Sequence, residues 1–236
     1  MSTIEEKLQT IAENTPKVYE SGKREGMNAF WDPYQDLGKR TKYDYGFCEF
    51  GWTDELFKPK YDMVVSSASR MFLNSGITDI KTYFKSESNP NGVLLDFSTC
   101  TTFTNTFQSS SVEKIGVLDT SSASALTYVM YQASSVKTID EFILKDDGSQ
   151  TWNLSNSFAN CTNLEEVRFK GKIGTNNFNV QWSVKLSHDS LMSIINCLAD
   201  KTGVSGTWKV TIGTTNLAKL TSDEIKIASN KGWTVD

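Results

Sequence analysis

Aromatic and aliphatic positions recur in a fixed order along the middle of the chain. Each copy has an aromatic residue, then a short run of small or polar residues, then two aliphatic residues three positions apart. The four copies are MFLNSGITDI from residue 71, TFQSSSVEKI from 106, MYQASSVKTI from 130 and SFANCTNLEEV from 157. The aromatic precedes the first aliphatic by five residues in three copies and by six in the fourth. This spacing predicts a structural repeat.

A single repeat cannot bury its own apolar edge, so we expect the copies to stack and to point the same residues inward. Successive aromatics are 35, 24 and 27 residues apart, within or just beyond the range of leucine-rich repeats. The small residues between them suit a tight turn. The predicted repeat core consists of Phe72, Ile77, Ile80, Phe107, Val112, Ile115, Tyr131, Val136, Ile139, Phe158, Leu164 and Val167.

The predicted strands follow these turns. They are TDIKTYF, VEKIGVLD, VKTIDEFIL and LEEVRFKG, with GVLLDFS as a further strand before the second copy. Residues 88–92 (SNPNG) and 145–151 (KDDGSQT) are rich in turn formers, so loop insertions there explain the uneven period.

The N-terminal segment has the heptad spacing of a helix. Residues at the a and d positions of a heptad recur at intervals of four and three residues, which predicts a helix starting near residue 3. Pro16 is expected to break or kink this helix. Two interpretations are open: self-association into a short parallel coiled coil, as a trimer or dimer, or docking on the chain's own globular part. The predicted oligomerisation residues are Ile4, Leu8, Ile11, Thr15 and Val18.

The segment that follows is unusually rich in aromatic residues and glycine. So many aromatic side chains are rarely left exposed on a soluble monomer. We expect them to cap the first repeat, because the end of a repeat array needs a cover; a sticky oligomer surface is the alternative.

The C-terminal segment carries signals for two helices and two strands. Ser187 is a predicted N-cap, and Thr221 with Glu224 forms a predicted capping box. TWKVTIG is a predicted strand after the first helix, and GWTVD is expected to be a short strand or a tail after the second.

Together these patterns predict an α+β fold. It is a β-rich, leucine-rich-repeat-like solenoid with an N-terminal amphipathic helix forming a short coiled coil and a C-terminal helix–strand–helix cap. The predicted divisions are 1–26 (oligomerisation or attachment helix), 27–64 (aromatic-rich N-terminal cap), 65–185 (repeats) and 186–236 (C-terminal cap).

Charge and composition narrow the function classes. The formal charge is −4, from 24 basic and 28 acidic residues, which predicts no nucleic-acid partner. No apolar run is long enough to cross a bilayer, and the acidic start MSTIEEKLQTIAEN is unlike a signal peptide, so we expect cytosolic synthesis without membrane insertion. The four cysteines match no metal-site spacing and are predicted to be reduced and mostly buried.

Catalytic constellations are not evident in the sequence. His188, Asp189 and Ser190 are consecutive, so they cannot orient one another as a triad, and a helix start explains them. KDDGSQTWN lacks the ligand pattern of a calcium loop. We therefore predict no catalytic, cofactor-binding or metal-binding residues, no cofactor and no enzymatic activity.

The repeated segments TFQSSSVEKI, MYQASSVKTI and SFANCTNLEEV resemble the BspA-type leucine-rich repeat over roughly residues 65–185. Such repeats occur in bacterial surface proteins and in phage and prophage structural proteins. The resemblance implies a non-enzymatic virion protein of the tail-fibre, receptor-binding or decoration type. Its implied partners are other copies of itself, other virion proteins and a host-surface glycan or protein. The alternative is a bacterial adhesin at the cell surface.

Overall fold

The computed structural model describes most of the chain from residue 42 onward. These residues belong to one compact unit, Thr41–Asp236. The predicted N-terminal helix, with Ile4, Leu8, Ile11, Thr15 and Val18, lies outside the described residues. The described residues are 42–48, 52–55, 57, 59, 62–84, 95–124, 126–149, 154 and 156–236.

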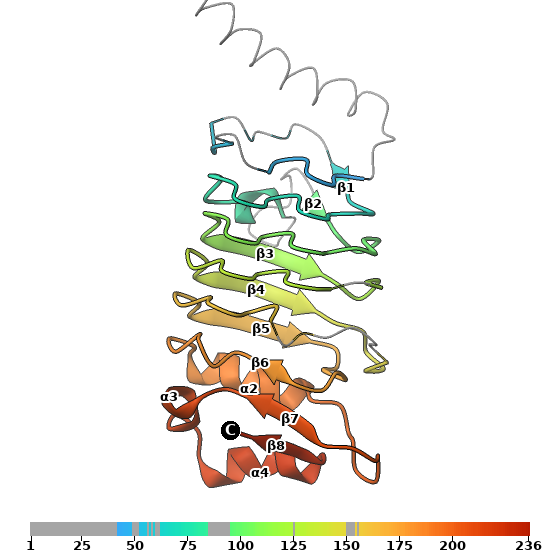
Figure 1. Ribbon diagram of the computed structural model, residues 1–236, viewed down its shortest axis with the longest axis vertical. Helices are drawn as coiled ribbons and strands as arrows, with labels where there is room; N and C mark the ends of the chain where they lie inside the picture. Colours follow the sequence, from blue (N-terminus) through green and yellow to red (C-terminus); the bar gives the residue numbers. More distant parts are fainter. Residues whose placement is uncertain are drawn as a thin grey trace, which may run out of the picture. The chain divides into compact units, whose positions relative to one another are not determined.

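The described chain consists of short strands and short helices, with most of the helices in the C-terminal part (Figure 1). The strands are β1 (Met63–Val64), β2 (Leu95–Asp96), β3 (Lys114–Asp119), β4 (Thr138–Ile143), β5 (Glu166–Lys170), β6 (Phe178–Asn179), β7 (Trp208–Thr211) and β8 (Trp233–Val235). The helices are the 3-10 helix η1 (Lys81–Tyr83) and the α-helices α2 (His188–Cys197), α3 (Thr214–Leu217) and α4 (Ser222–Asn230).

The strands form three separate sheets, in which every pair is parallel. Their orders are β1-β2, β3-β4-β5 and β6-β7-β8. The predicted continuous leucine-rich-repeat-like solenoid is therefore wrong. The described chain is a mixed α and β arrangement of three small parallel sheets with three short α-helices.

Helix α2 explains why the central sheet stops at β5. The Ser190 Oγ accepts a hydrogen bond from the Val167 N–H at 2.9 Å, and the Ser193 Oγ accepts one from the Phe169 N–H at 2.6 Å. Serines three residues apart lie on one helix face. Their hydroxyls take the place of a neighbouring strand's carbonyls, so the edge of β5 is satisfied without further pairing.

The outer face of the same sheet is covered near β3 by η1 and the residue after it. A Cβ at Gly116 of β3 would lie 2.6 Å from the Phe84 Cγ, so the missing side chain makes room for that ring. The Lys81 Nζ of η1 reaches past this position to the Asp140 Oδ1 of β4, at 2.8 Å. The edge of β3 itself pairs with the residues just before η1, through the parallel bridge between Asp79 and Lys114.

The repeated segments lie against one another in register through backbone hydrogen bonds. The Phe72 N–H donates to the Thr106 carbonyl at 2.8 Å, and the Phe107 N–H donates to the Val129 carbonyl at 2.8 Å. The Phe72 and Phe107 rings are stacked, with centroids 5.2 Å apart and planes 5° apart. Local register is therefore maintained between copies although the strands beside them break into separate sheets.

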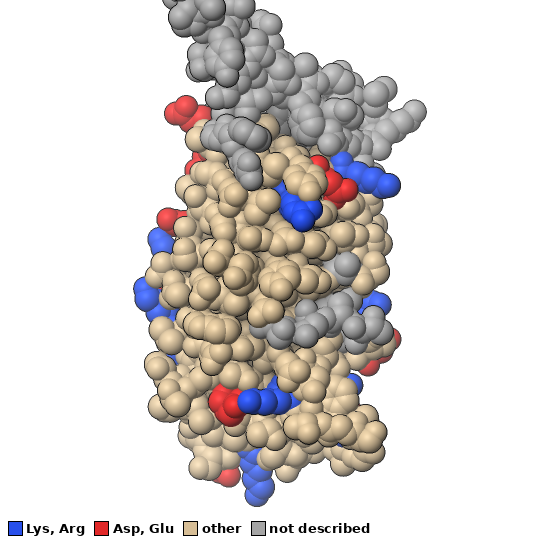
Figure 2. Space-filling view, viewed as in Figure 1, with Lys and Arg blue, Asp and Glu red and all other residues tan. Residues whose placement is uncertain are grey.

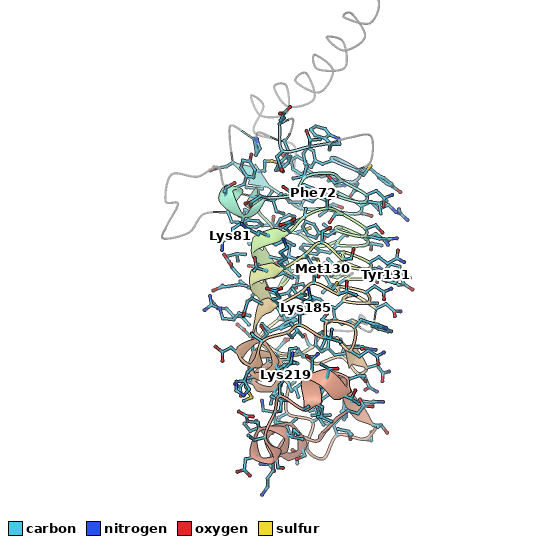
Figure 3. The ribbon with its side chains drawn as sticks, turned by 90° about the vertical axis from the view of Figure 1, so that its left-hand side faces the viewer. Phe72, Lys81, Met130, Tyr131, Lys185 and Lys219 are labelled. Atoms are coloured by element: carbon cyan, nitrogen blue, oxygen red, sulfur yellow. The ribbon has the colours of Figure 1, made fainter. Side chains whose placement is uncertain are left out.

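The third copy differs from the prediction by one residue. The register places Met130, not Tyr131, next to Phe107, and the Met130 N–H donates to the Ser157 carbonyl at 2.9 Å, just before Phe158. Met130 is fully buried, whereas Tyr131 is half-buried and points outward (Figure 3). The assignment of Tyr131 to the core is therefore wrong, because an unbranched methionine fills the inward position equally well.

The remaining predicted core residues are all buried. They are Phe72, Ile77, Ile80, Phe107, Val112, Ile115, Val136, Ile139, Phe158, Leu164 and Val167. At the N-terminal end, the Phe47 ring lies 5.5 Å from that of Phe72 and packs edge-on against Trp52 and Phe57. Phe47, Trp52 and Phe57 thus continue the same core, whereas Tyr45 is exposed.

The predicted caps of the C-terminal helices are confirmed. Ser187 is the N-cap of α2, and its side chain accepts from the Ser190 N–H. Thr221 and Glu224 form the complete capping box of α4. Helix α3 was not predicted from the sequence, because four residues are too few to show a helical period.

Removing the two serine hydroxyls of α2 tests their role at the edge of β5. We expect Ser190→Ala with Ser193→Ala to lower the free energy of unfolding by about 2–4 kcal/mol, since two enclosed N–H groups lose their acceptors at about 1–3 kcal/mol each. Urea unfolding measures this change. Ser229→Ala is the matched control, because that exposed hydroxyl bonds only within its own helix, to the Lys226 carbonyl. Equal losses in both proteins would contradict the account.

Candidate functional site

Charged and uncharged residues are separated within each repeat. Segments 97–112, 120–136 and 156–164 contain no charged residue at all. Between residues 95 and 187, every charged residue of the described chain lies in a strand or within four residues of a strand or of α2. One side of each repeat is therefore ionic, and the other consists of Ser, Thr, Asn, Gln and Tyr.

The exposed side chains of residues 101–109, 124, 126–134 and 156–163 form what we call the uncharged face. It is the face from which Tyr131 projects in Figure 3, and it faces the reader in Figure 2. Figure 2 shows almost no basic or acidic side chains between the two ends of this surface. A surface of this kind offers hydrogen bonds without ionic attraction.

Two columns of left-handed residues organise the uncharged face. We call the part of each repeat that lies on this face a row. Within a column, each row is joined to the next by backbone hydrogen bonds, such as Asn105 N–H to Thr127 carbonyl at 2.9 Å and Gln132 N–H to Ala159 carbonyl at 2.8 Å. All have φ between 52° and 62°. The first column is Tyr45, Arg70, Asn105 and Tyr128, and the second is Asn74, Ser109, Gln132 and Asn160.

Asparagine is a common residue in this conformation, whereas arginine, tyrosine and glutamine are unusual there. The recurrent Asn residues at turns partly predict these left-handed positions from the sequence. Nothing in the sequence predicts a left-handed conformation for Tyr128 or Gln132.

Tyr128 and Tyr131 form an exposed aromatic pair at the centre of the uncharged face. Their ring centroids are 5.2 Å apart and their planes are 76° apart. Tyr128 is 37% exposed. A different pair marks the N-terminal end of the same column, where the Arg70 guanidinium lies 5.1 Å from the centre of the Tyr45 ring. The positive charge of Arg70 therefore lies at the N-terminal end of the first column, away from the Tyr128–Tyr131 pair.

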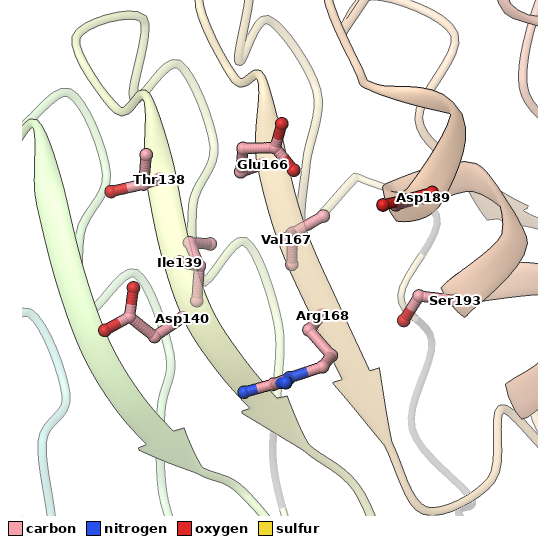
Figure 4. A pocket seen from close by; sticks show the side chains of 8 residues that line it. All are labelled: Thr138, Ile139, Asp140, Glu166, Val167, Arg168, Asp189 and Ser193. Carbon is pink, nitrogen blue, oxygen red and sulfur yellow. The ribbon is translucent and has the colours of Figure 1, made fainter. Parts of the chain in front are cut away.

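A groove of about 380 Å³ lies on the ionic side, between β4, β5 and α2 (Figure 4). Its lining side chains are Thr138, Ile139, Asp140, Glu166, Val167, Arg168, Asp189 and Ser193. A bulge in β4 places two residues opposite one residue of β5, so that Asp140 and Glu141 both face outward beside Arg168.

Most charges of this groove are already paired. Asp140 accepts from Lys81, and the Glu141 Oε1 lies 2.8 Å from the Arg168 guanidinium and 2.7 Å from the Lys170 Nζ. Ser187 Oγ donates to the Glu166 carboxylate at 2.8 Å. The lining offers no nucleophile held by a base, since the Ser193 hydroxyl is bound to the backbone of β5.

His188 lies outside the groove and joins two helix starts. Its Nε2 is 2.8 Å from the Glu224 Oε1 of α4, and its Nδ1 is 3.7 Å from the Asp189 Oδ1. Hydrogen bonds to Thr221 N–H lower the pKa of Glu224 more than its slight desolvation raises it. The Ser190 hydroxyl is bound to the backbone of β5 and to Ser187, so the three consecutive residues do not form a triad.

Two of the four thiols are deeply buried. Desolvation raises the pKa of both Cys100 and Cys161 to about 12, and the Cys161 Sγ donates to the Met130 carbonyl at 3.0 Å. Among the described residues, no group of three metal-ligating side chains comes together, and no helix is long and apolar enough to span a membrane.

The buried thiol of Cys161 predicts a pH dependence of stability. A folded-state pKa of about 12, against an ordinary value of 9.0, means that the protonated thiol contributes stability below pH 9 and that this contribution is lost as the pH rises from 9 towards 12. Urea unfolding at pH 8, 9, 10 and 11 should show a steeper loss for the wild type than for Cys161→Ala. Parallel pH profiles for the two proteins would refute this prediction.

Comparisons with known proteins return no match. No protein-family model, no curated protein and no solved structure matches this chain. The resemblance to BspA-type repeats is therefore not supported by any of these comparisons.

Proposed function

We propose that this chain is a non-enzymatic binding protein that uses the uncharged face to attach a particle to a cell surface. The observation that carries the proposal is the separation of charge: three neighbouring rows expose only neutral polar and aromatic side chains, held in register by backbone hydrogen bonds. Repeated rows of this kind provide an extended surface for binding.

The resemblance to repeats of phage structural proteins supports a place in the virion. A tail-fibre, receptor-binding or decoration role requires adhesion without chemistry, which agrees with a groove whose carboxylates are engaged in ion pairs and hydrogen bonds. In this proposal the predicted helix within residues 1–26 joins copies of the chain together or to other virion proteins.

Binding to cell envelopes tests the proposal. The full chain, labelled with a fluorophore, is incubated with envelopes of the bacterium whose genome or phage carries the gene. We expect saturable binding. The affinity should not depend on salt concentration, because salt weakens only ionic attraction and the face carries no charge. Mass spectrometry of purified phage particles should detect the chain. Absence of saturable binding, or recovery of the chain only from cells and never from particles, would refute the proposal.

A further inference from the structure

We infer that the uncharged face binds a neutral carbohydrate chain, with the Tyr128–Tyr131 pair as its stacking platform. This inference depends on the proposed function, because it names the ligand class of the same surface. Elsewhere in the described chain, Glu141 beside the groove is paired with Arg168, His188 is paired with Glu224, and the Cys161 thiol donates to the Met130 carbonyl.

The charge distribution selects a neutral ligand. Acidic polysaccharides and nucleic acids gain much of their affinity from Lys and Arg. The rows of the face from residue 97 to 136 carry basic residues only at Lys114 of β3, on the ionic side. A ligand held here must therefore be recognised by hydrogen bonds and by apolar contact.

The aromatic pair supplies the apolar contact. The two rings are nearly perpendicular, so one ring face and one ring edge form a corner on the surface. Among the described residues, neither hydroxyl group has a hydrogen-bond partner, and Tyr128 is 37% exposed. Rings of this kind pack against the C–H face of a sugar while the hydroxyls bond to its edge.

The columns beside the pair supply the polar contacts. Asn105 lies one row from Tyr128, while Ser109 and Asn160 lie on either side of Gln132. Amide and hydroxyl side chains both donate and accept, as sugar hydroxyls do. Rows recur about every 4.8 Å, so an extended chain running across them meets a new polar group at each row. A protein partner would instead be expected to need a contiguous apolar centre.

The backbone of Tyr128 and Gln132 adds an independent argument. Both adopt left-handed φ values, 56° and 58°, which asparagine or glycine adopts at lower cost. A residue chosen for stability alone would be one of those two. Tyr45 adopts the same conformation, but its ring is engaged by the Arg70 guanidinium. Tyr128 has no such cation beside it, and a ligand contact explains why the costlier residue is retained there.

Competition for envelope binding tests the inference. The probe is the neutral polysaccharide fraction from the same envelopes, separated from the acidic fraction by anion exchange. The neutral fraction should displace the labelled full chain and the acidic fraction should not. Periodate oxidation of the envelopes, which cleaves vicinal diols, should abolish binding.

Variants of matched conformation identify the site. Tyr128→Asn should weaken binding at least tenfold while leaving the urea midpoint unchanged or higher. Tyr45→Asn is the control, since Tyr45 has the same conformation, φ 57°, but lies at the Arg70 end of the column, and it should bind as the wild type does. If Tyr128 has only a structural role, Tyr128→Asn should leave the affinity for envelopes unchanged.

The outcomes separate this inference from the proposed function. If the chain binds envelopes but periodate has no effect, or the acidic fraction competes, or the two variants behave alike, the carbohydrate inference is wrong and the attachment proposal stands. If the chain does not bind envelopes at all, both are wrong.

Discussion

Replacing Gly171 by alanine is expected to lower the free energy of unfolding by about 3 kcal/mol or more. Gly171 follows β5 with φ +78°, and a Cβ there would lie 2.2 Å from the Leu144 carbonyl oxygen. The left-handed conformation alone costs a non-glycine residue about 1–2 kcal/mol. The clash adds to this cost, because the obstructing atom is backbone held by the hydrogen bond from Leu144 N–H to the Lys170 carbonyl, at 2.9 Å.

Gly203→Ala is the matched control for this prediction. Gly203 has nearly the same φ, +73°, but an added Cβ would meet nothing within 4 Å. Its replacement should cost only the conformational part, about 1–2 kcal/mol. Urea unfolding followed by circular dichroism measures both losses. Equal values for the two variants would show that the backbone of β5 does not approach Leu144 as described.

Replacing Phe107 by alanine is expected to cost about 3–5 kcal/mol. The ring is fully buried and stacks on Phe72, so its removal leaves a cavity between two rows that cannot collapse without breaking their backbone register. Phe107→Leu keeps most of the volume and should cost less than about 2 kcal/mol. The same unfolding measurement applies. A loss below about 1 kcal/mol for the alanine variant would mean that Phe107 is not in the core.

The sequence was sufficient to predict which positions are apolar and inward in most of the repeats. Ile77, Val112, Val136 and Leu164 are all buried, and each follows the inward residue of its copy by five or six positions. The helix caps at Ser187 and Thr221 were also predictable, since capping depends on local residue types alone.

The breaks between the sheets could not be predicted from the repeat pattern. They depend on long-range replacements: α2 presents Ser190 and Ser193 to the edge of β5, and Phe84 covers Gly116 of β3. The serines at 187, 190 and 193 share one helix face, but nothing in the sequence indicates which strand they meet.

Only part of the uncharged face could be predicted from the sequence. Runs without charge can be read directly from residues 97–112 and 120–136. The outward position of Tyr131 could not be predicted from the sequence, because methionine and tyrosine are adjacent in MYQASS and either one fits the apolar position of the repeat. Only the backbone register decides between them, and it places Met130 inside.

The most direct test of this account is the pair of unfolding free energies for Met130→Ala and Tyr131→Ala. The register described above predicts a loss of about 2–5 kcal/mol for the buried methionine and within about 1 kcal/mol for the outward tyrosine. A larger loss for Tyr131→Ala than for Met130→Ala would contradict the account, since the tyrosine would then lie in the core and the exposed aromatic pair would not exist.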